Sequence, residues 1–398
     1  MSEEDRTDRM RRLVQWKVVN FHNALKGAKG EPAMTKKNSK TKRVSGTAEV
    51  MTIGIDLGDR TSRYCQLSQE GDVIEEGSFT NTAESIAKHF SGMSRARIAL
   101  EVGGQSAWIS RELERYGHQV LVANARDLRG ISQSDRKNDR NDAEKLARYA
   151  RMDPQLLNPI THRSIERQRD LNLIRARDAI VRSRTVLVNA VRGMAKGEGL
   201  RLPPTITNTF GERALNALSA ELVSCFQPLL DAIDGLSEQI GKCDQELVQM
   251  AERYPEAKKL REVPGVGILT AVSFVLTLGD KDRFTHSRDV GAYLGLQPKQ
   301  SQSGARNPQL GISKAGNGHM RKLLVQCAHH ILGRFGKDSA LREWGLNKIT
   351  SGGKNGKKRV IVAVARKLAV LLHRLWKTGV GYQPFFGKPD VIVNSPMA

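Results

Sequence analysis

The feature that most constrains the fold is a run of alternating strand and helix patterns between residues 51 and 123. Residues 51–58 alternate like a strand that ends in an acid followed by glycine, and a second strand follows after a turn. Strands that alternate with helices after such a hairpin predict a mixed sheet with helices on its faces, which is the α/β class. We expect strands at 51–58, 63–68, 73–79, 97–101 and 118–123, and helices at 82–90 and 105–116.

Four acidic residues stand at the ends of these strands or at the start of the next helix. Asp56 and Glu101 end the first and fourth strands, while Asp139 and Asp142 lie three apart where a helical pattern begins, so both face one side. In the simpler interpretation Asp142 caps that helix and Asp139 complements its dipole. In the other, the four carboxylates converge if the first and fourth strands are neighbours and the helix crosses the sheet edge. They would then bind two Mg²⁺ ions at a phosphodiester.

The charge of the chain points to a polyanionic partner. Its 398 residues carry 64 Lys and Arg against 42 Asp and Glu, giving a formal net charge of +22 and a pI near 10.0. Nucleic acid is the simplest such partner. A membrane surface competes, but the longest apolar run, residues 268–278, is too short to span a bilayer, and no signal-peptide pattern opens the chain. Four widely spaced cysteines without a Cys-x-x-Cys pair indicate the reducing cytoplasm, with neither a zinc site nor a disulfide framework.

The flanks of the predicted sheet domain have their own patterns. Residues 1–48 form a basic flexible extension that adds affinity for nucleic acid. Two long helical patterns, at 165–191 and 215–253, are separated by a break at 193–204. We interpret them as a coiled-coil arm used for dimerisation; the alternative is an ordinary helical hairpin packed on its own chain.

The C-terminal third combines a turn motif with charge of one sign. The sequence VPGVG at 263–267 has the form of a helix-hairpin-helix, whose glycines let backbone amides approach a phosphate; a plain tight turn is the alternative. From residue 290 to 388 the only acids are Asp338 and Glu343, whereas Lys and Arg recur. A solvated surface usually mixes signs, so this region favours a nucleic-acid face.

A loop within this basic region carries two serines, Ser301 and Ser303, among glycines and cations. By composition alone they are loop residues or phosphate hydrogen-bond donors, because no His or Asp base is adjacent to make either a nucleophile. After the loop we expect a basic amphipathic helix at 359–375 and a poorly ordered tail beyond residue 379.

Three motifs together resemble the catalytic domain of the DEDD insertion-sequence transposases. They read IGIDLG at 53–58, LEVGG at 100–104 and KNDRNDA at 137–143, and the resemblance extends over most of residues 50–380. It implies a ribonuclease-H-like, RuvC-like fold in which the acids bind Mg²⁺, or Mn²⁺ in its place. The acids concerned are Asp56, Glu101, Asp139 and Asp142.

The resemblance also implies a serine nucleophile. In that family a serine just before a glycine in the C-terminal domain attacks the phosphodiester and forms a covalent phosphoserine, and the matching position here is Ser303. The family often has an aromatic residue and then Ser-Ser where this chain has Ser301, Gln302 and Ser303, so Ser301 is the alternative. A metal-bound oxygen environment could activate a serine that lacks a protein base.

The resemblance further implies the partners. These are DNA at the element ends and at the target, an element-encoded guide RNA that selects both by base pairing, and further copies of the chain in dimers or tetramers. No membrane is involved. The acids and the serine lie in different domains and can meet across subunits, which would make oligomerisation a condition for cutting.

The sequence therefore predicts a chain with an α/β part and an all-α part that acts as a DNA transposase or recombinase. Three other functions remain as alternatives. A structure-selective nuclease of the Holliday-junction type would use the acids to activate water. An actin-like ATPase or sugar kinase would use GIDLG at 54–58 as a phosphate loop, but no later Asp-x-Gly nucleotide loop follows; a non-catalytic nucleic-acid-binding protein leaves the acids unexplained. The predicted parts are a basic extension (1–48), a ribonuclease-H-like catalytic domain (49–159), a coiled-coil spacer (160–255), a C-terminal transposase domain with the helix-hairpin-helix and the serine loop (256–378), and a tail (379–398).

Overall fold

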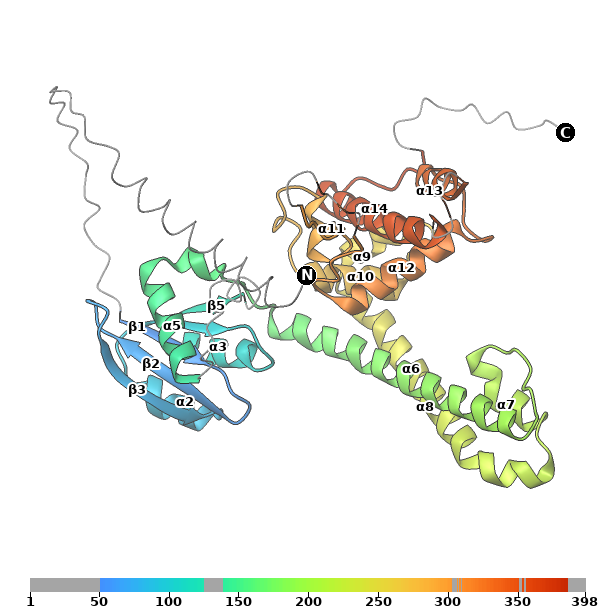
Figure 1. The fold of residues 1–398 in the computed structure, drawn as a ribbon, viewed down its shortest axis with the longest axis horizontal. Helices are drawn as coiled ribbons and strands as arrows, with labels where there is room; N and C mark the ends of the chain where they lie inside the picture. The colour runs from blue at the N-terminus through green and yellow to red at the C-terminus, as the bar shows by residue number, and fades with distance from the viewer. Residues whose placement is uncertain are drawn as a thin grey trace, which may run out of the picture. The chain divides into compact units, whose positions relative to one another are not determined.

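A computed structural model gives the fold of the chain, which divides into two compact units, Met1–Ile160 and Thr161–Ala398 (Figure 1). The structure describes residues 51–124, 139–302, 306, 308, 310–350, 353 and 356–385, and at 139 and 140 it describes the backbone only. The predicted basic extension at 1–48 therefore lies outside the described residues. Among the described helices, none has the length and apolar character that a membrane crossing needs.

The first unit is built on a five-stranded mixed sheet. Its strand order is β3-β2-β1-β4-β5, in which β2 runs antiparallel to β1 and β3, while β4 runs parallel to β1 and β5. This arrangement is consistent with a ribonuclease-H-like α/β domain. The strands are β1 (Thr52–Asp56), β2 (Thr61–Leu67), β3 (Val73–Thr80), β4 (Arg97–Glu101) and β5 (Gln119–Ala123).

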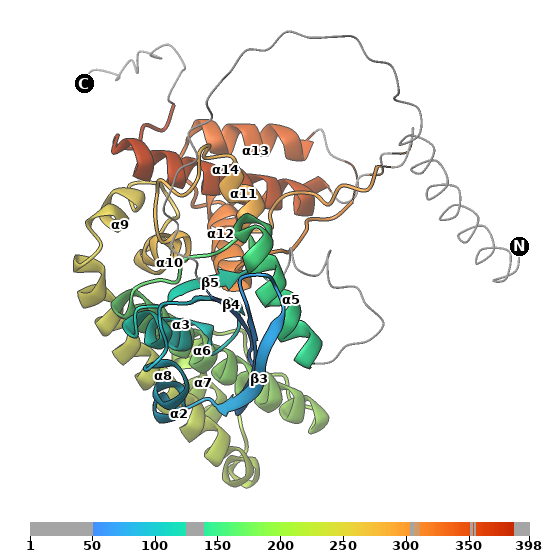
Figure 2. The ribbon, with the colours of Figure 1, turned by 90° about the vertical axis from the view of Figure 1, so that its left-hand side faces the viewer.

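Helices cover both faces of this sheet. Ile53 and Ile55 of β1 point to one face, where they share a buried core with α2 (Ala83–Phe90) and α3 (Ser106–Arg115). Gly54, between them, faces α5 (Asp139–Met152), because side chains alternate across a strand. Figure 2 shows α5 beside the strands of the sheet. A short 3-10 helix, η1 (Pro154–Leu157), follows α5.

The predicted elements of this unit agree with the observed ones to within about two residues at most ends. Thr82, the first residue of the predicted helix at 82–90, is the N-cap of α2, and its side chain accepts a hydrogen bond from the amide of Ser85. The proposed capping role of Asp142 is wrong, because α5 already includes Asp139 and Asp142 lies inside the helix.

The second unit begins with a long helical hairpin. Two helices of 33 residues each, α6 (Ile165–Gly197) and α8 (Ala220–Glu252), pack along one another (Figure 1). Between them lie η2 (Thr207–Thr209) and α7 (Phe210–Leu215). The expected break at residue 193 is wrong, because α6 continues to Gly197. The second long helix starts later than expected, because residues 216–219 form a turn between α7 and α8.

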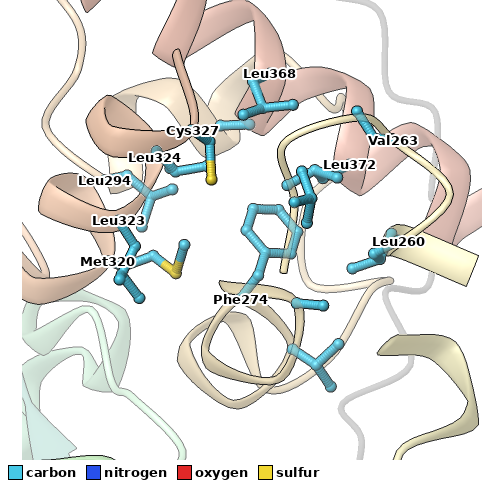
Figure 3. Close-up of a cluster of buried hydrophobic side chains, with 14 of the residues drawn as sticks. Leu260, Val263, Phe274, Leu294, Met320, Leu323, Leu324, Cys327, Leu368 and Leu372 are labelled. Atoms are coloured by element: carbon cyan, nitrogen blue, oxygen red, sulfur yellow. The ribbon is translucent and has the colours of Figure 1, made fainter. Parts of the chain in front are cut away.

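The remaining helices enclose the largest core of the chain. Phe274 is fully buried at its centre, among leucines of α12 and α14 (Figure 3). Leu171 of α6 and Leu247 of α8 join the same core, so the base of the hairpin is part of this unit. The helices are α9 (Pro255–Leu260), α10 (Ile268–Leu278), α11 (Asp289–Tyr293), α12 (Gly318–Leu332), α13 (Ala340–Thr350) and α14 (Gly356–Thr378).

The expectation of a poorly ordered tail after residue 379 is wrong for residues 379–385. The amide of Tyr382 donates to Glu262 Oε2 at 2.8 Å, and the amide of Ala340 donates to the carbonyl oxygen of Pro384 at 2.9 Å. Lys259 Nζ donates to the carbonyl oxygen of Gly379 at 2.9 Å. These bonds attach the segment to α9, α13 and the turn before α10. Local sequence patterns could not predict them, because they join residues far apart in the chain. The rest of the predicted tail lies outside the described residues.

Candidate functional site

Two of the predicted acids end neighbouring strands of the sheet. Strands β1 and β4 are parallel, with Ile55 opposite Leu100, so the next residues, Asp56 and Glu101, stand at adjacent carboxyl ends. Both side chains are half-buried. Ligands of open α/β sheets bind at this edge of the strands. One condition for convergence of the acids, that the first and fourth strands are neighbours, is therefore met.

A glycine brings α5 close to these two acids. A Cβ atom added to Gly54 would lie 2.0 Å from the carbonyl oxygen of Ala143 and 2.5 Å from the amide nitrogen of Ala147. The helix backbone therefore lies directly on β1, two residues before Asp56, and only glycine leaves room for it. Because Asp142 precedes Ala143, this contact fixes where its backbone lies. The side chain of Asp139 lies outside the described residues.

Asp142 has a cation beside it on the same helix. Lys145 Nζ lies 3.2 Å from Asp142 Oδ1, and the two side chains are 30% and 31% exposed. The pair is therefore partly solvated and is a weak contributor to stability. Among the side chains that the structure describes, no three His, Cys, Asp or Glu lie close enough together to hold a metal ion. The structure thus brings Asp56 and Glu101 to one edge, but among the described acids it does not place Asp142 close enough to complete a group of three metal ligands with them.

Two amide side chains that sequence reasoning missed connect the loops at this edge. Gln105 Nε2, after β4, donates to the carbonyl oxygens of Gly58 and Asp59, after β1. Asn81 Nδ2 donates to the Gly58 carbonyl oxygen at 2.9 Å. These bonds hold the loop behind Asp56 against two other connections. Neither residue belongs to a recognisable motif, although Gln105 directly follows the LEVGG sequence.

The serine loop, which belongs to the second unit, begins and ends in a short paired stem. A β-bridge pairs Pro298 with Ile312, and the amide of Lys299 donates to the carbonyl oxygen of Gly311 at 2.9 Å. Ser301 is exposed just beyond this stem. Ser303 lies outside the described residues.

An arginine and closely packed backbone hold the base of this stem in place. Arg321 Nη1 donates to the carbonyl oxygens of Leu294 and Ala315 at 2.9 and 2.8 Å. Gly295 and Gly316 have positive φ values of 69° and 76°, and a Cβ at either would lie 2.0 Å from a backbone oxygen of the facing segment. The stem is therefore held in one position by contacts that tolerate no side chain.

The turn between α9 and α10 also depends on glycine. Gly265 has a φ of 85°, and Gly267 is the N-cap of α10 without a side-chain hydrogen bond. Arg261 and Lys337 line the surface beside this turn, together with His330. Gly267 is exposed, so the turn places a glycine at the start of α10 beside these cations.

Comparison with known proteins assigns the family. One family model, described as the transposase IS116/IS110/IS902 family, matches residues 257–344, and another, described as transposase, matches residues 53–197. The transposase for insertion sequence element IS1328 of Yersinia enterocolitica is 31% identical over 327 residues, which cover 80% of this chain and 95% of that protein. The chain belongs to the IS110/IS116 family of DEDD transposases.

Other relatives of this DEDD transposase include a second transposase and a gene-inverting protein. The transposase for insertion sequence element IS1111A of Coxiella burnetii is 28% identical over 345 residues, covering 84% of this chain and 92% of that protein. A pilin gene-inverting protein of Moraxella lacunata is 24% identical over 337 residues, covering 80% and 93%. The resemblance drawn from the sequence is confirmed. Transposases cleave and join DNA, so the chain is an enzyme of insertion-sequence transposition and DNA recombination.

The DEDD transposase family implies a divalent metal ion, and the described residues are compatible with one. Half-buried carboxylates at adjacent strand ends supply the oxygen donors that hard divalent cations take. The family match at residues 53–197 spans the four predicted acids, and the match at residues 257–344 spans the serine loop.

Proposed function

We propose that this transposase excises and inserts its element with an acid cluster and a serine nucleophile. Asp56, Glu101, Asp139 and Asp142 would hold Mg²⁺, and Ser303 would attack the scissile phosphodiester. The observation that carries the proposal is the placement of Asp56 and Glu101 on adjacent parallel strands, beside the helix that bears both aspartates. The bound ion would supply positive charge for the developing charge on phosphate.

The chain's own groups account for the covalent step. The Ser303 hydroxyl oxygen forms a bond to phosphorus, its proton passes to solvent or a neighbouring carboxylate, and the deoxyribose oxygen leaves and takes up a proton. A hydroxyl of the second DNA strand then attacks the phosphoserine, which restores the serine and joins the strands. No energy source is needed, because each phosphodiester bond that breaks is replaced by another ester bond.

The partners and assembly belong to the same proposal. The substrate is DNA at the element ends and at the target, selected by an element-encoded guide RNA, and the protein acts in the cytoplasm. The hairpin of α6 and α8 is proposed as a coiled coil that joins subunits, and the turn between α9 and α10 as a helix-hairpin-helix. Support for rearrangement of DNA comes from the pilin gene-inverting relative, whose name describes inversion of a gene.

Covalent trapping tests the nucleophile. Wild-type protein incubated with element-end DNA, guide RNA and Mg²⁺ should give a protein–DNA adduct that survives denaturation, whereas Ser303→Ala should give none. Ser301→Ala is the matched control and should retain the adduct. Equal cleavage by wild type and Ser303→Ala, without an adduct, would instead support a nuclease that uses water, with Ser303 only positioning phosphate.

Replacing one acid tests the metal-binding half of the proposal. Asp142→Asn keeps the size of the side chain but removes its charge, so cutting should fall by at least about a hundredfold, because loss of a ligand costs more than the roughly 10–100-fold caused by loss of a group that only orients one. Glu144→Gln, two residues later on the same helix, is the control and should cut normally. Retained Mg²⁺-dependent cutting by Asp142→Asn would contradict the assignment of this residue.

A further inference from the structure

The C-terminal helices form a groove that neither the acid cluster nor the serine loop uses. It has a volume of about 880 Å³, within the range of typical ligand pockets. One wall is α13, the second is α14, and the third is the segment of residues 380–384 (Figure 1). Because the third wall is hydrogen-bonded to Glu262 and Ala340, the groove is formed in the protein without any ligand.

The lining of this groove combines apolar surface with positive charge. Leu341, Val370 and Leu371 contribute apolar surface, and the rings of Trp344 and Tyr382 lie in the walls. Its cations are Arg366, Lys367 and Arg374, and the described lining residues include no Asp or Glu. An acidic ligand with flat apolar parts is complementary to such a surface.

Two of the lining side chains are held in defined positions. Lys367 Nζ lies 4.3 Å from the centroid of the Trp344 ring, a cation–π contact that places its charge on the wall of the groove. Arg366 runs along α11, where Gly291 leaves room for it: a Cβ there would lie 3.0 Å from Arg366 Cγ. The charge of the groove is therefore ordered before a ligand arrives.

We propose that this groove binds an unpaired stretch of single-stranded DNA, with bases against the apolar walls and Trp344, and phosphates on Lys367 and Arg366. Aromatic rings in a positively charged groove are the usual platform for single strands, because every base has a flat face and the backbone is anionic. A duplex keeps its bases stacked inside and cannot offer them. The proposal extends the transposase function, since cutting and exchanging strands exposes unpaired DNA.

Binding of short oligonucleotides to the full-length protein tests this proposal. Fluorescence anisotropy would measure the affinity for fluorescein-labelled oligo-dT of eight nucleotides, in EDTA so that no cutting occurs. Trp344→Leu should weaken binding roughly tenfold, and Trp344→Phe should keep most of it, because a base stacks on either ring. Circular dichroism melts would measure whether both variants are folded, and Lys367→Gln carries the test if Trp344→Leu is not.

The salt dependence of the same affinity isolates the phosphate contact. Lys367→Gln should lower the slope of log affinity against log salt by about 0.7, the value for one phosphate contact to a single strand. Lys88→Gln, an equal charge change on an exposed residue of α2, should leave the slope unchanged. A slope for Lys367→Gln equal to that of wild type would overturn the proposal.

Three further outcomes would also overturn it. An eight-base-pair duplex that loses affinity equally with Trp344→Leu would exclude selection for single strands. Oligo-rU that binds while oligo-dT does not would assign the groove to RNA. If Trp344→Leu changed the sedimentation of the protein but not its affinity for oligo-dT, the groove would be assigned to binding a second copy of the chain. Oligo-dT binding is measured in EDTA, where no cutting occurs, whereas the catalytic proposal is tested by cutting and adduct formation, so failure of the groove proposal and failure of the catalytic proposal are distinguishable.

Discussion

At the scale of single residues, Gly54 shows how a position without chemistry can decide the geometry of a site. The carbonyl oxygen of Ala143 occupies the space that a Cβ atom would need. The alternation of residues 51–58 was enough to predict the strand and its final acid. It could not predict the contact with α5, because that contact joins residues almost ninety positions apart and leaves no periodic signal.

Gly54→Ala should lower the free energy of unfolding by about 1–3 kcal/mol, the usual cost of overpacking. It should also reduce DNA cutting by at least tenfold, because α5 must move away from β1 and takes Asp142 with it. Gly92→Ala is the control, since a Cβ there meets nothing within 4 Å. Urea denaturation and cleavage assays would measure both effects. Normal cutting by a folded Gly54→Ala protein would show that the position of α5 is not critical.

His373 is a buried histidine that no sequence pattern singles out. It is fully buried on α14; its Nδ1 accepts from the Ser287 hydroxyl and its Nε2 donates to the carbonyl oxygen of Lys281, both at 2.9 Å. Burial is the main cause that lowers the pKa of His373 below its ordinary value of 6.5, and Lys377 adds to it; the Lys281 carbonyl and Asp282 act in the opposite direction.

The unfolded chain therefore binds a proton near pH 6.5 that the folded protein does not. The free energy of unfolding should be constant above that pH and fall as the pH drops below it, by about 1.4 kcal/mol for each unit by which the pKa is lowered. Urea titrations between pH 7.5 and 5.5 would measure this. In His373→Gln the decrease should be smaller but not absent, because burial also lowers the pKa of His319. An equal decrease in the free energy of unfolding of wild type and His373→Gln would show that His373 does not cause the pH dependence.

At the scale of elements, local sequence patterns predicted the ends of strands well. They predicted the end of a helix wrongly where tertiary packing overrides the helix propensity of single residues. The ends of β4 were predicted to the residue, because its apolar run ends at an acid beside glycines. The helix break at residue 193 was wrong, because one glycine costs a helix only about 1 kcal/mol. Packing of the flanking Val191 and Ala195 in the buried core with α7 and α8 offsets that cost.

The stem of the serine loop is the element that would position Ser303 in the serine mechanism proposed above. Arg321→Gln would remove bonds to the carbonyl oxygens of Leu294 and Ala315, and hydrogen bonds from charged groups contribute about 1.5–3 kcal/mol each. We expect faster protease cleavage within residues 299–311 and slower formation of the covalent adduct, with DNA affinity within about twofold of wild type. Lys322→Gln, on the next residue of α12, is the control. Unchanged protease sensitivity in Arg321→Gln would show that the glycine contacts alone hold the stem.

At the scale of the whole molecule, sequence patterns predicted features within each unit but not the relation between the two units. The acids and the strands that end in Asp56 and Glu101 follow from patterns within about ninety residues, and the structure shows that these two strands are neighbours. The serine belongs to the other unit, and nothing in the alternation or charge of the sequence encodes how the two meet. The one-signed charge after residue 290 is a property that sequence does reveal, and it predicts how the molecule responds to salt.

Affinity for duplex DNA should fall steeply with salt, because Lys and Arg release counterions from the phosphates. Replacing Lys357, Lys358 and Arg359, three exposed cations at the start of α14, with Gln should lower the slope of log affinity against log salt by about 0.9 for each phosphate that the variant no longer neutralises. The matched triple variant at Lys88, Arg95 and Arg115, all exposed on the first unit, removes the same charge. Anisotropy titrations from 50 to 200 mM salt would compare them. If both triple variants lower the slope equally, DNA follows the net charge of +22 and the basic C-terminal region is no dedicated binding face.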